Sequence, residues 1–324
     1  MTKVFITDYI SDPDTEKEIL GPDLSEHISG DVKVLLVWHE NINGEYLDQF
    51  PRLQGVVRYG VGFDAIDLDE IKKRGLVFCN TPDYGTDEVS DTALTMLLNM
   101  LRGVTVYDDL SRGYIDNWQE NVIAELRRTS EMTLGIIGAG RIGTALILKA
   151  KALKINIIFF DPFKDSGYEK SLGVNRAYKL QELLEISDFI SIHTPLTEQT
   201  RGMVNQSFVD NMKDGASLIN TARGEIVEDL DILYKALISN KISNVALDVL
   251  PDEPPKACRF IDAWRNREPS LFRKIIINPH TSYYTLDAYN EMRIKASVNA
   301  RRILDGEEPL NIIADGRSQQ NKSV

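Results

Sequence analysis

Short apolar runs rich in valine, isoleucine and phenylalanine recur along the chain, and most of them do not alternate with polar residues. A strand inside a parallel sheet is covered on both faces, so it has this continuous apolar pattern. The expected strands are VFITDYI (4–10), VKVLLVW (32–38), GVVRYGVG (55–62), LVFCNTP (76–82), TLGIIGAG (133–140), INIIFFD (155–161), DFISIHTP (188–195), ASLINTA (216–222), NVALDVL (244–250) and KIIINPH (274–280). Helical patterns separate these runs, and the alternation predicts an α/β fold with doubly wound parallel sheets.

One helix is predicted clearly, in DEVSDTALTMLLNMLRG (87–103). Its apolar residues recur at intervals of three and four positions, which places them on one stripe of a helix. The stripe consists of Val89, Ala93, Met96, Leu97, Met100 and Leu101. A more polar stretch follows Gly103, and a second series of strands begins near Met132, so we predict a domain junction around residues 100–105.

Composition and charge narrow the class of protein. A chain of 324 residues is long enough for about two domains. Hydrophobic residues make up 43% and charged residues 27%, so the cores need neither disulfides nor a metal to fold. Cys79 and Cys258 are too few for a disulfide framework. The net charge of −12, from 37 basic and 49 acidic residues, argues against binding to nucleic acid.

The first residues, MTKVFITDYI, have no basic start followed by an apolar stretch and a cleavage site, so we expect no signal peptide. No apolar run approaches the ~18 residues that a membrane span requires. The sequence therefore predicts a soluble, cytoplasmic protein without a membrane partner.

The strongest chemical motif is LGIIGAGRIGTAL (134–146), in which Gly138, Gly140 and Gly143 have the GxGxxG spacing. The motif follows an expected strand and opens an expected helix, as a dinucleotide site requires. The first glycine permits the tight turn, the second lets a pyrophosphate approach the backbone, and the third lets the helix pack on the strand. The helix then offers N–H groups to the phosphates.

Asp161 ends the next expected strand, at about the 20-residue spacing of the acid that binds the ribose hydroxyls. A carboxylate at this position repels a 2′-phosphate, so the pattern predicts NAD rather than NADP. The alternatives are a plain glycine turn and a solvated carboxylate at the end of a strand.

Three later stretches, taken with this fingerprint, resemble the D-isomer-specific 2-hydroxyacid dehydrogenases. They are NTARGEIV (220–227), ALDVLPDEPP (246–255) and NPHTSYY (278–284). The resemblance covers nearly the whole chain and is strongest to the branch related to the C-terminal-binding-protein corepressors. It implies two Rossmann-like domains, with the NAD-binding domain (102–288) inserted into a substrate-binding domain (1–101 plus 289–324).

The resemblance assigns a catalytic trio. Arg223 would bind the substrate carboxylate, which suits its planar fork of donors. His280 would exchange the proton, and Glu253 would stabilise the charged form of its ring. Read without the family, His280 is a structural histidine at a strand end, Arg223 a surface ion-pair partner, and Glu253 a solvated loop acid.

The resemblance also implies further contacts with the cofactor. They would come from the first turn of the fingerprint helix, from HTPLTEQT (193–200) and from the ends of the later strands. The expected residues are Arg141, Ile142, His193, Thr194, Pro195, Thr200, Thr221, Ala222 and Asp248. His193 could instead lie near the ligand without binding it, and Asp248 could cap a helix or a loop.

On the substrate side, RYGVGFD (58–64) matches the loop whose backbone holds the carboxylate, through Val61 and Gly62, with Arg58 also reaching the substrate. His39 matches a residue of the corepressor branch, although a capping or partly buried histidine is an equal alternative. Tyr283 stands where relatives often have Trp or Phe, so its hydroxyl suggests a more polar substrate. The stretch 254–274 is longer than in many family members. Its alternatives are a lid, an oligomer contact and plain decoration.

These features predict an NAD-dependent enzyme that interconverts a small 2-keto acid and its D-2-hydroxy acid by hydride transfer. The alternative is an NAD(H)-gated binding protein of the corepressor type, with little or no turnover. The family is usually dimeric, so we expect a homodimer whose contact includes the apolar helix at 89–101.

Overall fold

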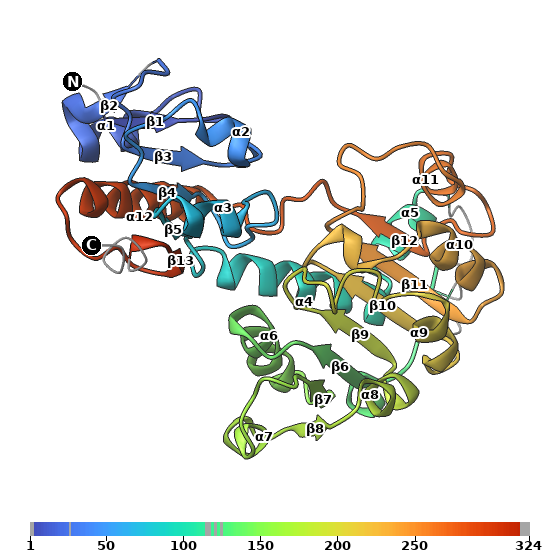
Figure 1. Cartoon of the computed structure of the whole chain (residues 1–324). Coiled ribbons are helices and arrows are strands. Elements are labelled where there is room, and N and C mark those ends of the chain that lie inside the picture. Colours follow the sequence, from blue (N-terminus) through green and yellow to red (C-terminus); the bar gives the residue numbers. More distant parts are fainter. Residues whose placement is uncertain (1–2, 26, 114–117, 120–121, 124–125, 318–324) are drawn as a thin grey trace. The chain divides into compact units, whose positions relative to one another are not determined.

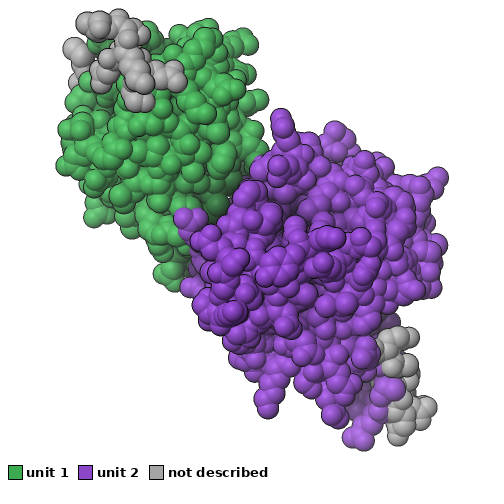
Figure 2. Space-filling model, turned by 60° about the horizontal axis from the view of Figure 1, so that its bottom comes forward, with its two compact units in different colours: residues 1–85, 284–324 green, residues 86–283 purple. Residues whose placement is uncertain are grey.

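The computed structural model describes residues 3–25, 27–113, 118–119, 122–123 and 126–317. The chain forms two compact units, unit 1 (residues 1–85 and 284–324) and unit 2 (residues 86–283) (Figure 2). Each unit contains one largely parallel sheet, and the predicted α/β class is confirmed.

Unit 1 contains a six-stranded sheet in the order β13-β5-β4-β3-β1-β2 (Figure 1). Its strands are β1 (Val4–Ile6), β2 (Leu24–Ser25), β3 (Val34–Val37), β4 (Gly55–Arg58), β5 (Val77–Cys79) and β13 (Ile312–Asp315). Its helices are α1 (Asp14–Leu20), the 3-10 turn η1 (Gly21–Asp23), α2 (Gly44–Leu47), α3 (Leu68–Lys73) and α12 (Leu286–Leu304). All neighbouring strands are parallel except β13, which runs antiparallel to β5.

Both faces of the unit 1 sheet are covered, which is why its strands are continuously apolar. Leu35, Val37 and Val56 pack in one core cluster with residues from α2 and α3. On the other side α12 packs on β3, β4 and α1. Residues more than 200 positions apart in the sequence therefore share one core.

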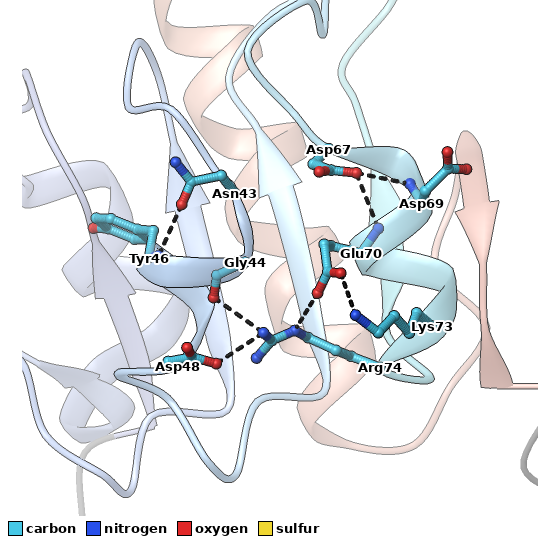
Figure 3. A network of polar contacts seen from close by, with 9 residues as sticks. All are labelled: Asn43, Gly44, Tyr46, Asp48, Asp67, Asp69, Glu70, Lys73 and Arg74. Atoms are coloured by element: carbon cyan, nitrogen blue, oxygen red, sulfur yellow. Dashed lines mark hydrogen bonds and ion pairs between the residues drawn. The ribbon is translucent and has the colours of Figure 1, made fainter.

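A polar network joins the short helices α2 and α3 (Figure 3). Asn43 caps α2 by accepting from the amide of Tyr46, and Asp67 caps α3 through two amides. The Arg74 guanidinium donates to the carbonyl of Gly44 at 3.0 Å and to Asp48 at 2.8 Å, and it also contacts Glu70 on its own helix. These contacts join α2 to α3.

Unit 2 contains a seven-stranded parallel sheet in the order β12-β11-β10-β9-β6-β7-β8. Its strands are β6 (Thr133–Ile137), β7 (Asn156–Phe160), β8 (Asn175–Ala177), β9 (Phe189–Ile192), β10 (Ala216–Asn220), β11 (Ile242–Leu247) and β12 (Ile275–Ile277). Its helices are α4 (Thr86–Arg102), α5 (Val104–Ser111), α6 (Arg141–Lys151), α7 (Tyr168–Leu172), α8 (Leu180–Ile186), α9 (Gln206–Asn211), α10 (Leu230–Ile238) and α11 (Arg259–Arg265), with 3-10 turns η2 (Thr129–Glu131) and η3 (Gly224–Ile226).

The predicted helix is α4, and its apolar stripe is buried inside unit 2. Ala93 and Leu97 are fully buried, in one cluster with Leu134, Leu146 and other residues of β6 and α6. The two units therefore divide at 85/86 and 283/284, whereas we predicted boundaries at 101/102 and 288/289. The expected dimer contact through this helix stays a prediction, and its buried stripe leaves only the other faces of α4 for it.

The long stretch at 254–274 contains α11, and its Phe260 and Ile261 are fully buried in the second core cluster of unit 2. This stretch is therefore a folded part of the domain. The strands β2, β8 and β13 were not predicted: β2 (LS) and β8 (NRA) contain no apolar run, and the short run in β13 (IIAD) was missed. Among the described residues, no helix combines the length and apolarity needed to cross a membrane.

Candidate active site

The order of strands in unit 2 reverses between β6 and β9: the chain runs through β7 and β8 to one side, then through β10, β11 and β12 to the other. In sheets of this kind, ligands bind at the carboxyl ends of the strands beside such a switch point. The sequence-predicted residues of unit 2 follow β6, β7, β9, β10, β11 and β12 at this edge. The topology thus places the expected cofactor residues at one edge of the sheet.

The three fingerprint glycines have different surroundings. Gly138 has φ +90°, and a side-chain Cβ there would lie 2.7 Å from the carbonyl oxygen of His193. A Cβ at Gly143 would lie 2.0 Å from the carbonyl oxygen of Gly138, so this glycine lets α6 approach β6. A Cβ at Gly140 would meet nothing within 4 Å. Space remains at the one glycine where a pyrophosphate must approach, and Arg141 and Ile142 form the adjoining turn of α6.

Asp161 lies beside this turn. One carboxylate oxygen accepts from the amide of Ala139 at 2.9 Å, and the other accepts from the amide of Phe163 at 2.9 Å. The side chain is therefore fixed against the glycine turn at the end of β7. Each carboxylate oxygen has a second lone pair, so these bonds leave capacity for ribose hydroxyls.

The loop after β9 contains His193, Thr194, Pro195 and Thr200. His193 Nε2 lies 2.8 Å from the hydroxyl of Ser191, and burial lowers the pKa of His193 to about 4. The ring is therefore neutral at physiological pH. Thr200 donates to the carbonyl of Pro195 at 2.7 Å and closes the loop on itself.

Several buried polar atoms at this edge of the sheet have no hydrogen-bond partner within the described part of the chain. They include His193 Nδ1, Thr194 Oγ1 and Thr221 Oγ1. Such atoms are costly unless something satisfies them. Their position after β9 and β10, together with the open space at Gly140 and the fixed Asp161, fits a polar ligand such as a dinucleotide.

Arg223 follows β10 in a tight turn. Asn220 holds the turn by donating to the carbonyl of Arg223 and accepting from the amide of Ala222, both at 2.9 Å. A Cβ on Gly224 would lie 2.0 Å from the backbone of Leu250. Gly224 therefore lets the Arg223 turn pack directly on the segment that leads to Glu253.

Glu253 and His280 form the most specific contact of the site. Glu253 Oε2 lies 2.6 Å from His280 Nδ1, while Oε1 accepts from the amide of Leu250 at 2.8 Å. Burial raises the pKa of Glu253, but the His280 contact, that amide and the Arg223 charge outweigh burial and lower the pKa below its usual value. The carboxylate is therefore charged and fixed at both oxygens.

Asp248 holds the loop that carries His280. Its carboxylate accepts from the amides of Thr281 and Ser282, and its own carbonyl accepts from the amide of His280 at 2.8 Å. His280 itself has φ +56°, an uncommon conformation for a non-glycine residue. Asp248 thus makes the contacts of a loop cap, and Tyr283 lies three residues beyond His280.

The remaining predicted residues lie in unit 1, at the carboxyl ends of β3 and β4. Asp8 accepts from the amide of His39 at 2.6 Å. Arg58 donates to the carbonyl of Tyr59 at 2.9 Å, and Val61 is exposed. Gly62 follows in the same loop.

Gly60 is essential to the backbone of this loop. It has φ +117°, and a Cβ there would lie 2.4 Å from the Arg58 guanidinium. The positive φ is what requires glycine, since the guanidinium is the end of a flexible side chain that can move.

The sequence did not predict the two residues that bond the backbone of this loop. Thr81 accepts from the amide of Gly60 at 2.6 Å and donates to the carbonyl of Arg58. Asn80 donates to the carbonyl of Val61 at 2.6 Å. Both residues follow β5, which is the parallel neighbour of β4. Polar residues directly after two adjacent parallel strands could have predicted that Asn80 and Thr81 contact the loop after β4.

Comparison with known proteins adds to this geometry. Residues 94–282 match the family model described as the NAD-binding domain of D-isomer-specific 2-hydroxyacid dehydrogenases. The chain is 33% identical over 276 residues to a glyoxylate reductase of Korarchaeum cryptofilum, covering 84% of this chain and 79% of the relative. It is 30% identical over 297 residues to C-terminal-binding protein 1 of Caenorhabditis elegans, covering 90% of this chain but only 40% of that longer relative.

A solved structure has the same fold. The D-lactate dehydrogenase of Aquifex aeolicus, crystallised with NAD and lactic acid, superposes with a TM-score of 0.83 at 28% identity. The match covers 96% of this chain and 99% of that chain.

Proposed function

This chain belongs to the D-isomer-specific 2-hydroxyacid dehydrogenase family, and from that premise we propose that it interconverts a small 2-keto acid and its D-2-hydroxy acid. The observation that carries the proposal is the 2.6 Å contact between Glu253 and His280, which lies within the segment that matches the NAD-binding domain model. A charged carboxylate fixed on one ring nitrogen leaves the other nitrogen to exchange a proton.

In the direction of reduction, His280 Nε2 donates a proton to the carbonyl oxygen of the 2-keto acid, and the product is an alcohol. Glu253 stabilises the imidazolium before this transfer and orients its ring throughout. In the direction of oxidation, the neutral ring accepts the proton of the alcohol. NAD, when bound, would supply or accept the hydride that balances this proton.

The carboxylate of the substrate requires its own partners. In unit 2 we assign this role to Arg223, whose turn is fixed by Asn220 and Gly224, with Tyr283 as a candidate substrate contact. For unit 1 the family resemblance suggests the amides of Val61 and Gly62, with Arg58 and His39 at the same edge of the sheet. A planar guanidinium binds both oxygens of a carboxylate and orients the adjoining carbonyl.

The NAD would be held by the glycine turn, Asp161 and the loop at 193–200. Thr221 would meet its nicotinamide end through a hydroxyl that has no partner among the described residues, with Ala222 beside it. For Asp248 we propose a structural role toward the His280 loop, in addition to any contact with the carboxamide.

The proposal is tested by following NADH oxidation with glyoxylate, pyruvate and hydroxypyruvate in the native protein, His280→Ala, Glu253→Gln and the control His27→Ala. His27 is a surface residue outside the site. Loss of a general acid typically lowers kcat by about 100-fold or more, so His280→Ala should lose turnover but retain NADH binding. Glu253→Gln should lose less, and His27→Ala nothing.

Full activity in His280→Ala would contradict the assignment of the proton carrier. Tight NADH binding without turnover of any 2-keto acid would favour the alternative, an NAD(H)-gated binding protein.

A further inference from the structure

Arg176 is a buried positive charge at the edge of the unit 2 sheet. It lies in the middle of β8, the last strand in the order of the sheet, where β8 pairs with β7 (Figure 1). Its side chain is only 8% exposed. A charge at this depth is costly unless hydrogen bonds replace the water that it loses. The partners of its guanidinium therefore indicate what the residue does.

The guanidinium bonds the backbone of the loop that follows β7. Nη2 donates to the carbonyl of Asp161 at 3.0 Å and to that of Lys164 at 2.7 Å, and Nη1 donates to the carbonyl of Asp165 at 3.0 Å. These three bonds hold residues 161–165 around one planar, rigid group. Arg176 thus fixes the backbone of this loop from the neighbouring strand.

The contacts of Arg176 differ from those of an ordinary ion pair. The carboxylate of Glu169 lies 3.8 Å from Nη1, and the same carboxylate oxygen accepts from the amide of Gly167. The guanidinium carbon lies 5.8 Å from the centre of the Phe159 ring and 5.2 Å from that of Tyr178. Carbonyl dipoles and ring faces therefore stabilise most of this charge, and its main effect is on the shape of the loop.

The loop that Arg176 bonds contains the acid expected to bind the ribose. The two carboxylate oxygens of Asp161 accept from the amides of Ala139 and Phe163. The carbonyl of Asp161 accepts from Arg176. Asp161 is therefore held from three sides, by the glycine turn, by its own loop and by β8.

A second cation of the same loop is also held by the protein. Lys164 Nζ lies 4.8 Å from the centre of the Tyr168 ring, and the Tyr168 hydroxyl lies 2.8 Å from Thr144 Oγ1 on α6. A cation that faced the ribose would attract the 2′-phosphate of NADP. Here backbone carbonyls and the Tyr168 ring hold the two cations, whereas the Asp161 carboxylate lies against the glycine turn.

From this arrangement we propose that Arg176 is a positioning residue that sets the preference for NAD over NADP. This inference rests on the proposed function, in which Asp161 binds the ribose. A 2′-phosphate beside a fixed carboxylate meets a like charge at short range, which disfavours NADP. Without the three bonds from Arg176 the loop can shift, so the carboxylate can move away from a 2′-phosphate and the ribose hydroxyls of NAD lose an aligned acceptor.

The test measures the dissociation constants of NADH and NADPH by fluorescence titration in the native protein, Arg176→Met, Arg176→Lys and the control Arg265→Met. Arg265 is an exposed arginine on α11, outside the site. Arg176→Met should lower the ratio of the NADPH constant to the NADH constant about tenfold, because a charge-assisted contact loses its alignment. Arg176→Lys should lower the ratio only about threefold, since an ammonium group bonds some of the same carbonyls. Arg265→Met should leave the ratio unchanged.

Asp161→Asn separates positioning from general stability. Alone it should lower the ratio at least about tenfold, because it removes the charge that repels a 2′-phosphate. Adding Arg176→Met to Asp161→Asn should change the ratio no further, since Arg176 acts through that carboxylate.

Equal weakening of NADH and NADPH in Arg176→Met, with the native ratio retained, would overturn the inference and leave Arg176 a structural residue. Arg176→Lys decides by the same ratio if Arg176→Met does not fold. A further fall of the ratio in the double variant would also overturn the inference. The titrations need no turnover, so failure to reduce any 2-keto acid would contradict the proposed reaction without changing these ratios.

Discussion

His193 follows β9 with its Nε2 2.8 Å from the hydroxyl of Ser191, and burial lowers its pKa from 6.5 to about 4. In the unfolded chain the ring binds a proton near its ordinary pKa. Between these two values the unfolded state binds more protons than the folded state, so the free energy of unfolding rises with pH. The contribution of His193 is complete above pH 6.5 and is lost as the pH falls toward 4.

We therefore expect the native protein to lose about 2 kcal/mol of unfolding free energy through His193 between pH 7 and pH 5. The variant His193→Gln cannot titrate, so its unfolding free energy should fall by that much less over the same interval. Urea denaturation of both proteins at the two pH values measures the difference. Equal losses in the two proteins would show that His193 is not buried as a neutral ring.

Two carboxylates near His280 have pKa values displaced in opposite directions. Burial raises the pKa of Asp248, whereas for Glu253 the effect of burial is outweighed by the His280 contact and nearby donors, and the pKa is lowered. Asp248 bonds the backbone of the His280 loop, and Glu253 bonds the ring. Asp248 therefore positions the backbone of the His280 loop, and Glu253 positions the His280 ring.

At the scale of elements, the segment made of β6, its glycine turn and α6 must pack closely and must also bind the cofactor. Different glycines meet these two requirements. Gly143 lies against the backbone of Gly138, whereas Gly140 faces open space at an ordinary negative φ. Alanine at each position therefore tests one requirement at a time.

Gly143→Ala should lower the free energy of unfolding by at least about 2 kcal/mol, because the new methyl group overlaps a carbonyl oxygen. Gly140→Ala should change it by less than about 0.5 kcal/mol but weaken NADH binding at least tenfold, since the methyl group occupies the path of the pyrophosphate. Urea denaturation and fluorescence titration with NADH measure the two effects. Unchanged NADH binding in Gly140→Ala would place the pyrophosphate elsewhere.

At the scale of the whole molecule, unit 1 is built from two segments at opposite ends of the chain. Glu16 on α1 and Arg293 on α12 join them through a buried ion pair. Tyr59 donates to the same carboxylate, and burial raises the pKa of Tyr59 well above its usual value, so its hydroxyl keeps its proton. One pair thus connects both terminal segments to the start of the loop at 58–62.

Glu16→Gln leaves the Arg293 charge buried without a counterion, and removal of one partner of such a pair typically costs about 3–5 kcal/mol. We expect a loss of that size in the unfolding free energy, together with a higher KM for the 2-keto acid. Replacing both residues, as Glu16→Gln with Arg293→Met, should recover part of the stability. The control is Glu18→Gln, an exposed carboxylate on the same helix. Equal stability of Glu16→Gln and Glu18→Gln would contradict this account.

Much of the fold follows from local pattern. Continuous apolar runs predicted β1, β3 to β7 and β9 to β12, and the spacing of Ala93, Leu97 and Leu101 predicted α4. The strands β2 and β8 have one apolar residue each and so no apolar run, and the short run of β13 was missed. The assignment of α4 to unit 2 also escaped prediction, since an apolar stripe does not reveal which partner buries it.

The sequence by itself determined the α/β class, the glycine fingerprint with Asp161, and the residue types of the proposed trio, because strand and helix periodicity and motif spacing are properties of neighbouring residues. The tertiary structure alone decided the 2.6 Å contact between Glu253 and His280, the ring contact of Tyr9 with Trp38, and the pairing of Glu16 with Arg293. These contacts join residues 27 to 277 positions apart. Their formation depends on the packing of whole elements, which local pattern does not specify.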